Sequence, residues 1–401
     1  MTTLILSLLA CAPEAPTDTP AKDAPAALTT PAIPVEPSAS NTTTPPSMSS
    51  PLYVSPRCDA LAERPDGRTT FYETNPTYED PTDHAGPYAT VPPEKVGLSK
   101  AMLQDVSDQL GTHGFVQSFL VFVDGELAWE HYGKNTAPTD SHNIHSASKS
   151  LLATAVGIAI DAGHLQQDDT LGRWLPDATA DLSQAKQDIT VRQLLEMTAG
   201  FEWVEDETEA EIEKERDWVR AILEQSLVAE PGTRFNYNTG QTHLLSAVLQ
   251  EATGRSTCDY VHEVLLDPLD IDAEHWGRDP QGIYSGGYNV YMTPRELARF
   301  GLMIDQGGQW EGEQVVPRPW VQDMLSRHQT DDPYGYGLLW WNRPIRGHQV
   351  QIAWGYGGQF IYLVPDLDLM VVVTTDTHDH DPWFWDAEYV LYGALIPALE
   401  R

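Results

Sequence analysis

The chain has 401 residues, 41% of them hydrophobic, so it can bury a substantial core and is long enough for more than one domain. It carries 24 basic and 59 acidic residues, a formal net charge of -35, and such a field repels nucleic-acid phosphates and anionic lipid headgroups. We therefore expect no nucleic-acid partner and interpret the acidity as a solvated surface. The 3 cysteines form no C-x-x-C pair, so neither a zinc ribbon nor a redox dithiol is supported. We predict no metal and no cofactor.

The N-terminal segment has the composition of an export signal followed by a linker. Residues 1–11 resemble a lipoprotein signal, with a short apolar stretch that ends at Cys11 but no basic residue before it. Residues 12–57 are rich in Pro, Ala, Thr and Ser, which is typical of a disordered tether. No later segment is apolar for the roughly 20 residues that a membrane helix needs, so any membrane attachment would be through lipid at Cys11. We expect an exported protein, periplasmic or at the cell surface.

The sequence does not decide whether the other two cysteines are bonded to each other. Cys58 and Cys258 could form a disulfide if the protein is exported, but sequence does not give their separation in space. Two free buried thiols are the alternative.

Residues 58–401 are predicted to form one folded domain of α/β (α+β) type, an antiparallel sheet flanked by helices with a helical subdomain at about 168–279. Hydrophobic periodicity and turn signals support this reading, such as the hairpin dipeptide Asp124-Gly125 and a helix-ending glycine at Gly254. The predicted elements, in chain order, are a helix over 98–110, strands over 118–123 and 126–132, a helix after Ser146, helices over 191–197, 244–253 and 294–306, strands over 337–341, 359–364 and 369–374, and a closing amphipathic helix over 383–399.

The most informative motif is Ser146-Ala147-Ser148-Lys149, which stands where a polar loop gives way to a long apolar run. A serine and a lysine three positions apart at the start of a helix lie on one face, so the amine can accept the hydroxyl proton. The first helical turn also offers unpaired N–H groups to a developing negative charge. We therefore predict that Ser146 is a nucleophile and that Lys149 is its base.

A second Ser-x-x-Lys match occurs at Ser183 and Lys186. It lies in a polar stretch with no apolar helix after it, so we expect its lysine to stay solvated and protonated. We interpret this match as accidental.

A second element supports Ser146, the run from Pro231 to Gly240 that contains Tyr237-Asn238-Thr239. With the Ser-x-x-Lys element it makes the chain resemble the serine β-lactamase and penicillin-binding protein family, in the class C-like branch of carboxylesterases, D-aminopeptidases and 6-aminohexanoate-dimer hydrolases. The resemblance runs from about 91 to 396 and implies a β-lactamase/transpeptidase-like fold. It also implies that Tyr237 is a proton relay. Thr239 stands where the branch has an asparagine, and the resemblance implies that it contributes to substrate binding or to the oxyanion site.

The third element of that family, a Lys-Thr-Gly or His-Thr-Gly on the strand beside the site, is replaced here by the stretch 353–359, Ala-Trp-Gly-Tyr-Gly-Gly-Gln. Gly355 and Gly357 suit a strand that lies close to a substrate, and the N–H of Tyr356 could form an oxyanion hole with that of Ser146. The missing lysine makes penicillin hydrolysis less expected. Arg346 and His348 are weak candidates to replace it.

These elements predict a serine hydrolase that cleaves a small ester or amide through an acyl-enzyme. The alternatives are a D-amino-acid peptidase or β-lactamase acting on cell-wall-type substrates, and a non-catalytic binding lipoprotein of the same fold. We interpret the acidic run 205–215 as a solvated helix face. The aromatic residues near the site either form a pocket for an apolar acyl group or pack in the core. Those aromatic residues are Trp340, Trp341, Trp354 and Tyr356. The exact substrate and the oligomeric state stay open.

Overall fold

The computed structural model describes residues 54–62, 88–112, 114–133, 136–329, 334–377 and 388–400. The predicted signal at 1–11 and almost all of the predicted tether at 12–57 lie outside the described residues. The first described helix, α1 (Pro56–Ala62), begins two residues before the predicted start of the folded domain at 58.

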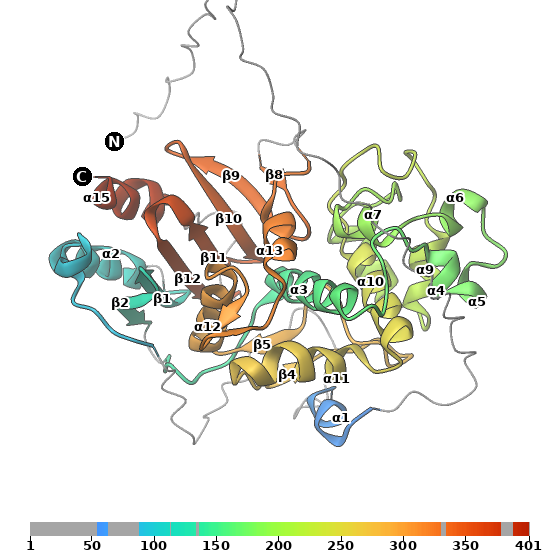
Figure 1. Ribbon diagram of the computed structural model, residues 1–401, viewed down its shortest axis with the longest axis horizontal. Coiled ribbons are helices and arrows are strands. Elements are labelled where there is room, and N and C mark those ends of the chain that lie inside the picture. The colour runs from blue at the N-terminus through green and yellow to red at the C-terminus, as the bar shows by residue number, and fades with distance from the viewer. Residues whose placement is uncertain are drawn as a thin grey trace, which may run out of the picture. The chain divides into compact units, whose positions relative to one another are not determined.

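A seven-stranded antiparallel sheet forms the centre of the fold (Figure 1), in the order β2-β1-β12-β11-β10-β9-β8. The predicted hairpin is confirmed: Asp124 and Gly125 both have positive φ, 52° and 74°, as a two-residue turn between twisted strands requires. In this order β12, the last strand of the sheet in the chain, pairs with β1, the first. The strands are β1 (Val116–Val123), β2 (Glu126–Tyr132), β8 (Gly335–Tyr336), β9 (Trp341–Ile345), β10 (His348–Gly355), β11 (Gln359–Val364) and β12 (Leu369–Thr375).

Alternate residues of these strands face two separate cores. On one face, Phe119 and Val121 of β1 and Val373 of β12 pack with α2 (Lys100–Thr112) and with the consecutive C-terminal helical turns α14 (Glu388–Val390), η6 (Leu391–Leu395) and α15 (Ile396–Leu399). On the other face, Leu120 and Val372 belong to the larger core that contains α3 (Ser148–Asp161) and α12 (Pro294–Asp305). The sheet is therefore a buried layer between helices.

The predicted helical subdomain lies beyond α3 from the sheet (Figure 1). Its longest helix is α10 (Thr239–Thr253), which ends at Gly254 in the left-handed conformation, as predicted. Helix α10 packs on α3, and α3 in turn contacts β10 of the sheet. The other helices of the subdomain are α4 (Leu171–Trp174), α5 (Pro176–Thr179), α6 (Gln184–Gln187), α7 (Val191–Leu195), α8 (Glu207–Ile212), α9 (Trp218–Glu224) and α11 (Thr257–Val261), followed by the short turns η3 (His262–Leu266) and η4 (Asp267–Leu269).

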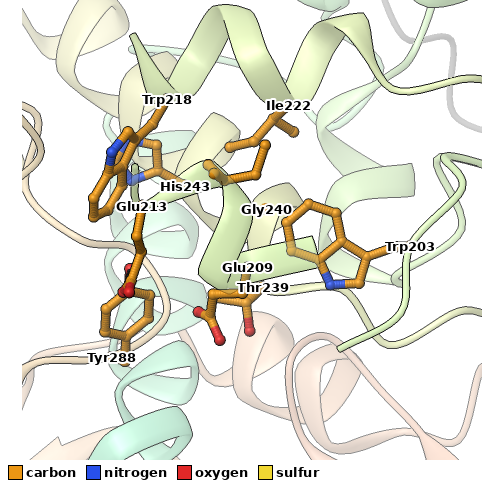
Figure 2. A pocket seen from close by; sticks show the side chains of 10 residues that line it. Trp203, Glu209, Glu213, Trp218, Ile222, Thr239, Gly240, His243 and Tyr288 are labelled. Carbon is orange, nitrogen blue, oxygen red and sulfur yellow. Dashed lines mark hydrogen bonds between the residues drawn. The ribbon is translucent and has the colours of Figure 1, made fainter. Parts of the chain in front are cut away.

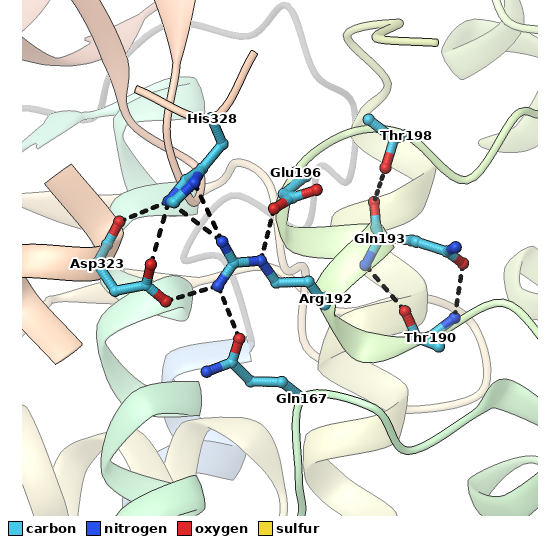
Figure 3. Close-up of polar contacts among 8 residues, drawn as sticks. All are labelled: Gln167, Thr190, Arg192, Gln193, Glu196, Thr198, Asp323 and His328. Atoms are coloured by element: carbon cyan, nitrogen blue, oxygen red, sulfur yellow. Dashed lines mark hydrogen bonds and ion pairs between the residues drawn. The ribbon is translucent and has the colours of Figure 1, made fainter. Parts of the chain in front are cut away.

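Arg192 on α7 fastens the subdomain to α13 (Arg318–Leu325), as Figure 3 shows. Its guanidinium donates to Asp323 on α13 at 2.6 Å and to Glu196, the residue directly after α7, at 2.5 Å. Thr190 and Gln193 form a capping box that starts α7. Because the same side chain binds carboxylates from two elements, it fixes the angle at which they meet.

The predicted strand over 337–341 is wrong. Residues 337–340 form a turn between β8 and β9 in which Leu339 has a positive φ of 57°. The apolar run is explained by burial in the larger core, and the Leu339 backbone bonds to Leu195 and to the Ser150 hydroxyl. The strand lies further on, as β9, and β10 was not predicted.

Short elements complete the described residues. They are η1 (Pro93–Val96), η2 (His145–Ala147), η5 (Pro365–Leu367), a small sheet of β3 (His142–Asn143), β5 (Val290–Met292) and β4 (His275–Trp276), and the pair β6 (Gln309–Trp310) and β7 (Glu313–Gln314).

A disulfide joins Cys58 on α1 to Cys258 on α11, with 5.9 Å between the two Cα atoms. Of the two pairings left open by the sequence, the structure therefore contains the bonded one. None of the helices among the described residues is both long and apolar enough to traverse a bilayer.

Candidate active site

Ser146 lies on a tight turn directly before α3. The turn is η2, and His145 within it has a positive φ of 46°. The side chain of Asn143 accepts a hydrogen bond from the His145 N–H at 2.9 Å, which holds this unusual backbone conformation. Ser146 is partly exposed, whereas the following residues of α3 are buried. The serine hydroxyl is therefore presented at the partly exposed turn just before the buried N-terminal part of α3.

Lys149, one helical turn later, is only 1% exposed. Its Nζ lies 2.9 Å from the Ser146 Oγ and donates to the backbone carbonyl of Gly287 at 3.0 Å. A neutral amine has two N–H groups and one lone pair, so with Gly287 accepting one proton the lone pair can face the serine hydroxyl. The predicted side-chain pair is thus brought together in the structure.

Burial lowers the pKa of the Lys149 amine below its ordinary value of 10.5. The negative charges of Glu205, Glu209 and Asp206 oppose this shift and favour the ammonium form. Burial is the larger effect, so the environment favours the neutral amine that a general base must be.

Tyr237 faces Lys149 from the start of α10. Its ring centroid lies 5.1 Å from the Lys149 Nζ and stacks on Trp341, with 5.2 Å between the ring centroids. Asn238 begins α10 by accepting from the Gln241 N–H at 3.1 Å, so the tyrosine immediately precedes a fixed helix start. Burial raises the pKa of Tyr237 well above 10, and a hydrogen bond with Ser146 acts in the opposite direction. Tyr237 is therefore a neutral phenol that can donate a proton.

The third sequence element lies against the nucleophile turn. A Cβ on Gly355, at the end of β10, would lie 2.2 Å from the backbone oxygen of Ile144, so only glycine permits this approach. Gly357 has a positive φ of 75°, and the Tyr356 ring lies 5.6 Å from that of His145. The glycines thus bring the strand backbone to the turn that carries Ser146.

The remaining sequence candidates have other surroundings. Trp340 is fully buried in the core, whereas Trp354 and Trp341 are partly exposed, with 5.7 Å between their ring centroids. Arg346 and His348 both bond to Glu400 at the outer turn of the sheet. Among the contacts of the described residues, none therefore joins Arg346 or His348 to Ser146.

The second Ser-x-x-Lys match does not form a serine–lysine pair. The Lys186 amine is partly buried and donates to the backbone carbonyl of Leu223 at 2.6 Å. The lysine was expected to stay solvated and protonated, but it is partly buried, and burial lowers its pKa. Ser183 instead lies at the start of α6.

The acidic run was misjudged from sequence. It was predicted to be a solvated helix face, but Glu209 is only 6% exposed and burial raises its pKa well above the ordinary value. Figure 2 shows it in a cavity with Thr239, between Trp203 on one side and Trp218 and Tyr288 on the other. The apolar residues at helical spacing, of which Ile212 is one, were the available signal that this segment folds inward.

One group of metal-ligand types occurs among the described residues: Cys58, Cys258 and His262, with ligand atoms within 4.8 Å of one another. Both sulfurs are already bonded to each other, so this group does not offer thiolate ligands.

A central antiparallel sheet covered by helices, with a Ser-x-x-Lys pair at the start of the buried helix, defines the serine hydrolases of the β-lactamase/transpeptidase-like fold. The Beta-lactamase family model matches residues 100–393, and the chain belongs to this family. It is 27% identical over 367 residues to the 6-aminohexanoate-dimer hydrolase of Paenarthrobacter ureafaciens, covering 82% of this chain and 90% of that protein.

Solved structures share the fold. A D-stereospecific amidohydrolase from Streptomyces sp. is similar with a TM-score of 0.60 and 18% identity, over 75% of this chain and 99% of that one. EstCE1, a hydrolase with promiscuous acyltransferase activity, also gives a TM-score of 0.60 at 18% identity, over 70% of this chain and 94% of the other. The predicted family and fold are confirmed, and the protein is a hydrolase.

Proposed function

We propose that the protein cleaves a small ester or amide through a covalent acyl-enzyme on Ser146, with Lys149 as general base and Tyr237 as proton relay. The observation that carries this proposal is the 2.9 Å contact between the Ser146 hydroxyl and a buried amine whose pKa is lowered. A lysine in water would be protonated at neutral pH and could not take the proton.

The reaction follows from this arrangement. Lys149 accepts the hydroxyl proton as Ser146 attacks the substrate carbonyl, and Tyr237 donates a proton to the departing alcohol or amine. Backbone N–H groups of Ser146 and Tyr356 would stabilise the oxyanion. The Lys149 ammonium then returns its proton to the Tyr237 phenolate, so that both groups are neutral again. Water attacks the acyl-enzyme and gives a proton to Lys149, which passes it to the departing Ser146 oxygen as the acid is released. In this proposal Gly355 and Gly357 give the substrate access to the strand backbone.

A fluorophosphonate probe tests the nucleophile, because it labels only an activated serine. We expect one label on Ser146 in the folded protein and none in Ser146→Ala. Labelling of both proteins, or of neither, would contradict the proposal. The second result would favour a non-catalytic binding protein of the same fold.

A substrate panel tests the substrate class. Linear amides are supported by the name of the relative that aligns over 82% of this chain, a 6-aminohexanoate-dimer hydrolase. We therefore expect turnover of p-nitrophenyl esters and of aminohexanoate oligomers, and little of nitrocefin. Turnover of D-alanyl amides or nitrocefin alone would instead favour the D-amino-acid peptidase or β-lactamase alternative.

We also propose that the protein is exported and anchored, if at all, through lipid at Cys11. The Cys58–Cys258 disulfide supports export, because such bonds persist in oxidising compartments. Fractionation of cells that express the full chain, with mass spectrometry of the N-terminal peptide, tests this proposal. A cytosolic protein with free thiols at both positions would contradict it.

A further inference from the structure

The carboxylate of Glu205 receives hydrogen bonds from two different parts of the chain. Its Oε2 accepts from the Trp203 indole at 2.6 Å and from the backbone N–H of Thr239 at 3.1 Å. Its Oε1 accepts from the Thr239 hydroxyl. Thr239 is the first residue of α10, so Glu205 places a negative charge at a helix N-terminus, where the helix dipole favours it.

These contacts occupy the polar groups of Thr239. Its side chain is buried, its hydroxyl proton goes to Glu205, and its backbone carbonyl accepts from the Thr242 hydroxyl at 2.7 Å. A hydroxyl has one proton to donate, so Thr239 cannot also donate to a substrate while it is bound to Glu205. This chain therefore uses the third position of the Tyr-x-Asn element differently from the substrate contact expected from the resemblance.

Thr239 also lies against the residues that hold Lys149. A Cβ built on Gly287 would be 2.8 Å from the Thr239 Cγ2 and 3.1 Å from the Lys149 Nζ. The Gly287 carbonyl is the acceptor of the Lys149 amine, and Tyr237 stands two residues before Thr239. A displacement of Thr239 would therefore reach both Tyr237 and Lys149.

We propose that Glu205 is a positioning residue, which fixes the start of α10 through Thr239 and thereby holds Tyr237 and the Gly287–Lys149 contact in place. Thr239 serves as the anchor point of this contact and does not bind the substrate. The inference rests on the proposed function, because it concerns the same reaction.

The charge of Glu205 provides a readout that a purely structural contact would not. Charges at Glu205, Glu209 and Asp206 act on Lys149, while the neutral groups Ser146 and Tyr237 face it. Glu205 contributes the largest of the effects that raise the pKa of Lys149 against burial. Removing its charge would favour the neutral amine, so the pKa of Lys149 would fall. The acid side of the pH profile of kcat/KM would move to lower pH.

Two variant pairs test the proposal by steady-state ester hydrolysis. Thr239→Val should lower kcat by about 10- to 100-fold with little change in KM, because a small misplacement of catalytic groups has an effect of this order. Thr239→Ser keeps the hydroxyl and should restore most of the rate. Glu205→Gln should move the acid side of the profile to lower pH, whereas Glu207→Gln, an exposed neighbour on α8, should leave it unchanged.

The outcomes separate this inference from the proposed function. If Thr239→Val raises KM with kcat preserved, Thr239 binds the substrate and the inference fails. It fails equally if Glu205→Gln, folded by circular dichroism, keeps both the wild-type kcat and the wild-type pH profile. A wild-type protein that neither turns over esters nor reacts with the fluorophosphonate would instead remove the proposed function, and this inference with it.

Discussion

Replacing Lys149 with methionine separates the chemical role of its amine from its packing. The methionine side chain is also unbranched and fills similar space, but its thioether sulfur is far too weak a base to take the serine proton. General-base assistance is worth about 10²- to 10⁴-fold in rate, which corresponds to about 3 to 5 kcal/mol of activation free energy. We expect the full loss in Lys149→Met, because Tyr237, which also contacts Ser146, has a raised pKa and is no substitute base.

Stability should respond in the opposite direction. Burial lowers the pKa of Lys149, so the folded protein binds the proton of this amine more weakly than the unfolded chain does, and burying the amine costs stability wherever the unfolded chain holds that proton. This cost is present below the unfolded pKa and disappears as the pH rises through it. Lys149→Met has no such cost, so the urea concentration at its unfolding midpoint should be equal to or higher than that of the wild type.

The matched control is Lys186→Met, in the other Ser-x-x-Lys sequence. In the wild type the Lys186 amine donates to the Leu223 carbonyl. Lys186→Met loses this hydrogen bond, so we expect a loss of about 1 kcal/mol of stability and unchanged turnover. The measurement is kcat/KM for a p-nitrophenyl ester with urea titration of each variant. The reasoning would be refuted if Lys149→Met lost less than about tenfold in rate, or if both lysine variants lost the same factor.

Three further predictions concern the disulfide, the third element and pH. Replacing Cys58 and Cys258 together with serine should destabilise the protein in urea by at most about 5 kcal/mol, the chain-entropy value for a separation of 200 residues; an unchanged midpoint would contradict this. Gly355→Ala should lower both turnover and Tm, because the new Cβ would meet the Ile144 carbonyl at 2.2 Å; wild-type values of both would show that β10 can move away. In the wild type, kcat/KM should fall as the pH is lowered through the reduced pKa of Lys149, since the ammonium is inactive; a flat acid side would argue against a lysine base.

Local sequence signals were sufficient where an element depends on its own residues. The Asp124-Gly125 turn and the helix that ends at Gly254 both have the backbone conformations that their residue types favour. The Ser146–Lys149 contact was also predictable, because it depends only on helical spacing. Such features need no knowledge of the rest of the chain.

Contacts between distant segments were not predictable in this way. β9 and β10 contain many polar residues and a proline, so their pattern is weak, although Arg346 and Gly347 at their turn both have positive φ. The burial of Glu209 is another example, because a run of glutamates is usually solvated. Its environment is created partly by α10, which no local pattern connects to it.

The order of the sheet has a consequence for biosynthesis. β1 pairs with β12, and the hydrogen-bonded hydroxyls of Ser118 and Thr374 are 256 positions apart in the chain. During translation the early hairpin therefore has an open edge until almost the whole domain has been made. Unprotected strand edges favour association between chains, so the yield of native enzyme should depend on chaperones or on the pace of the ribosome.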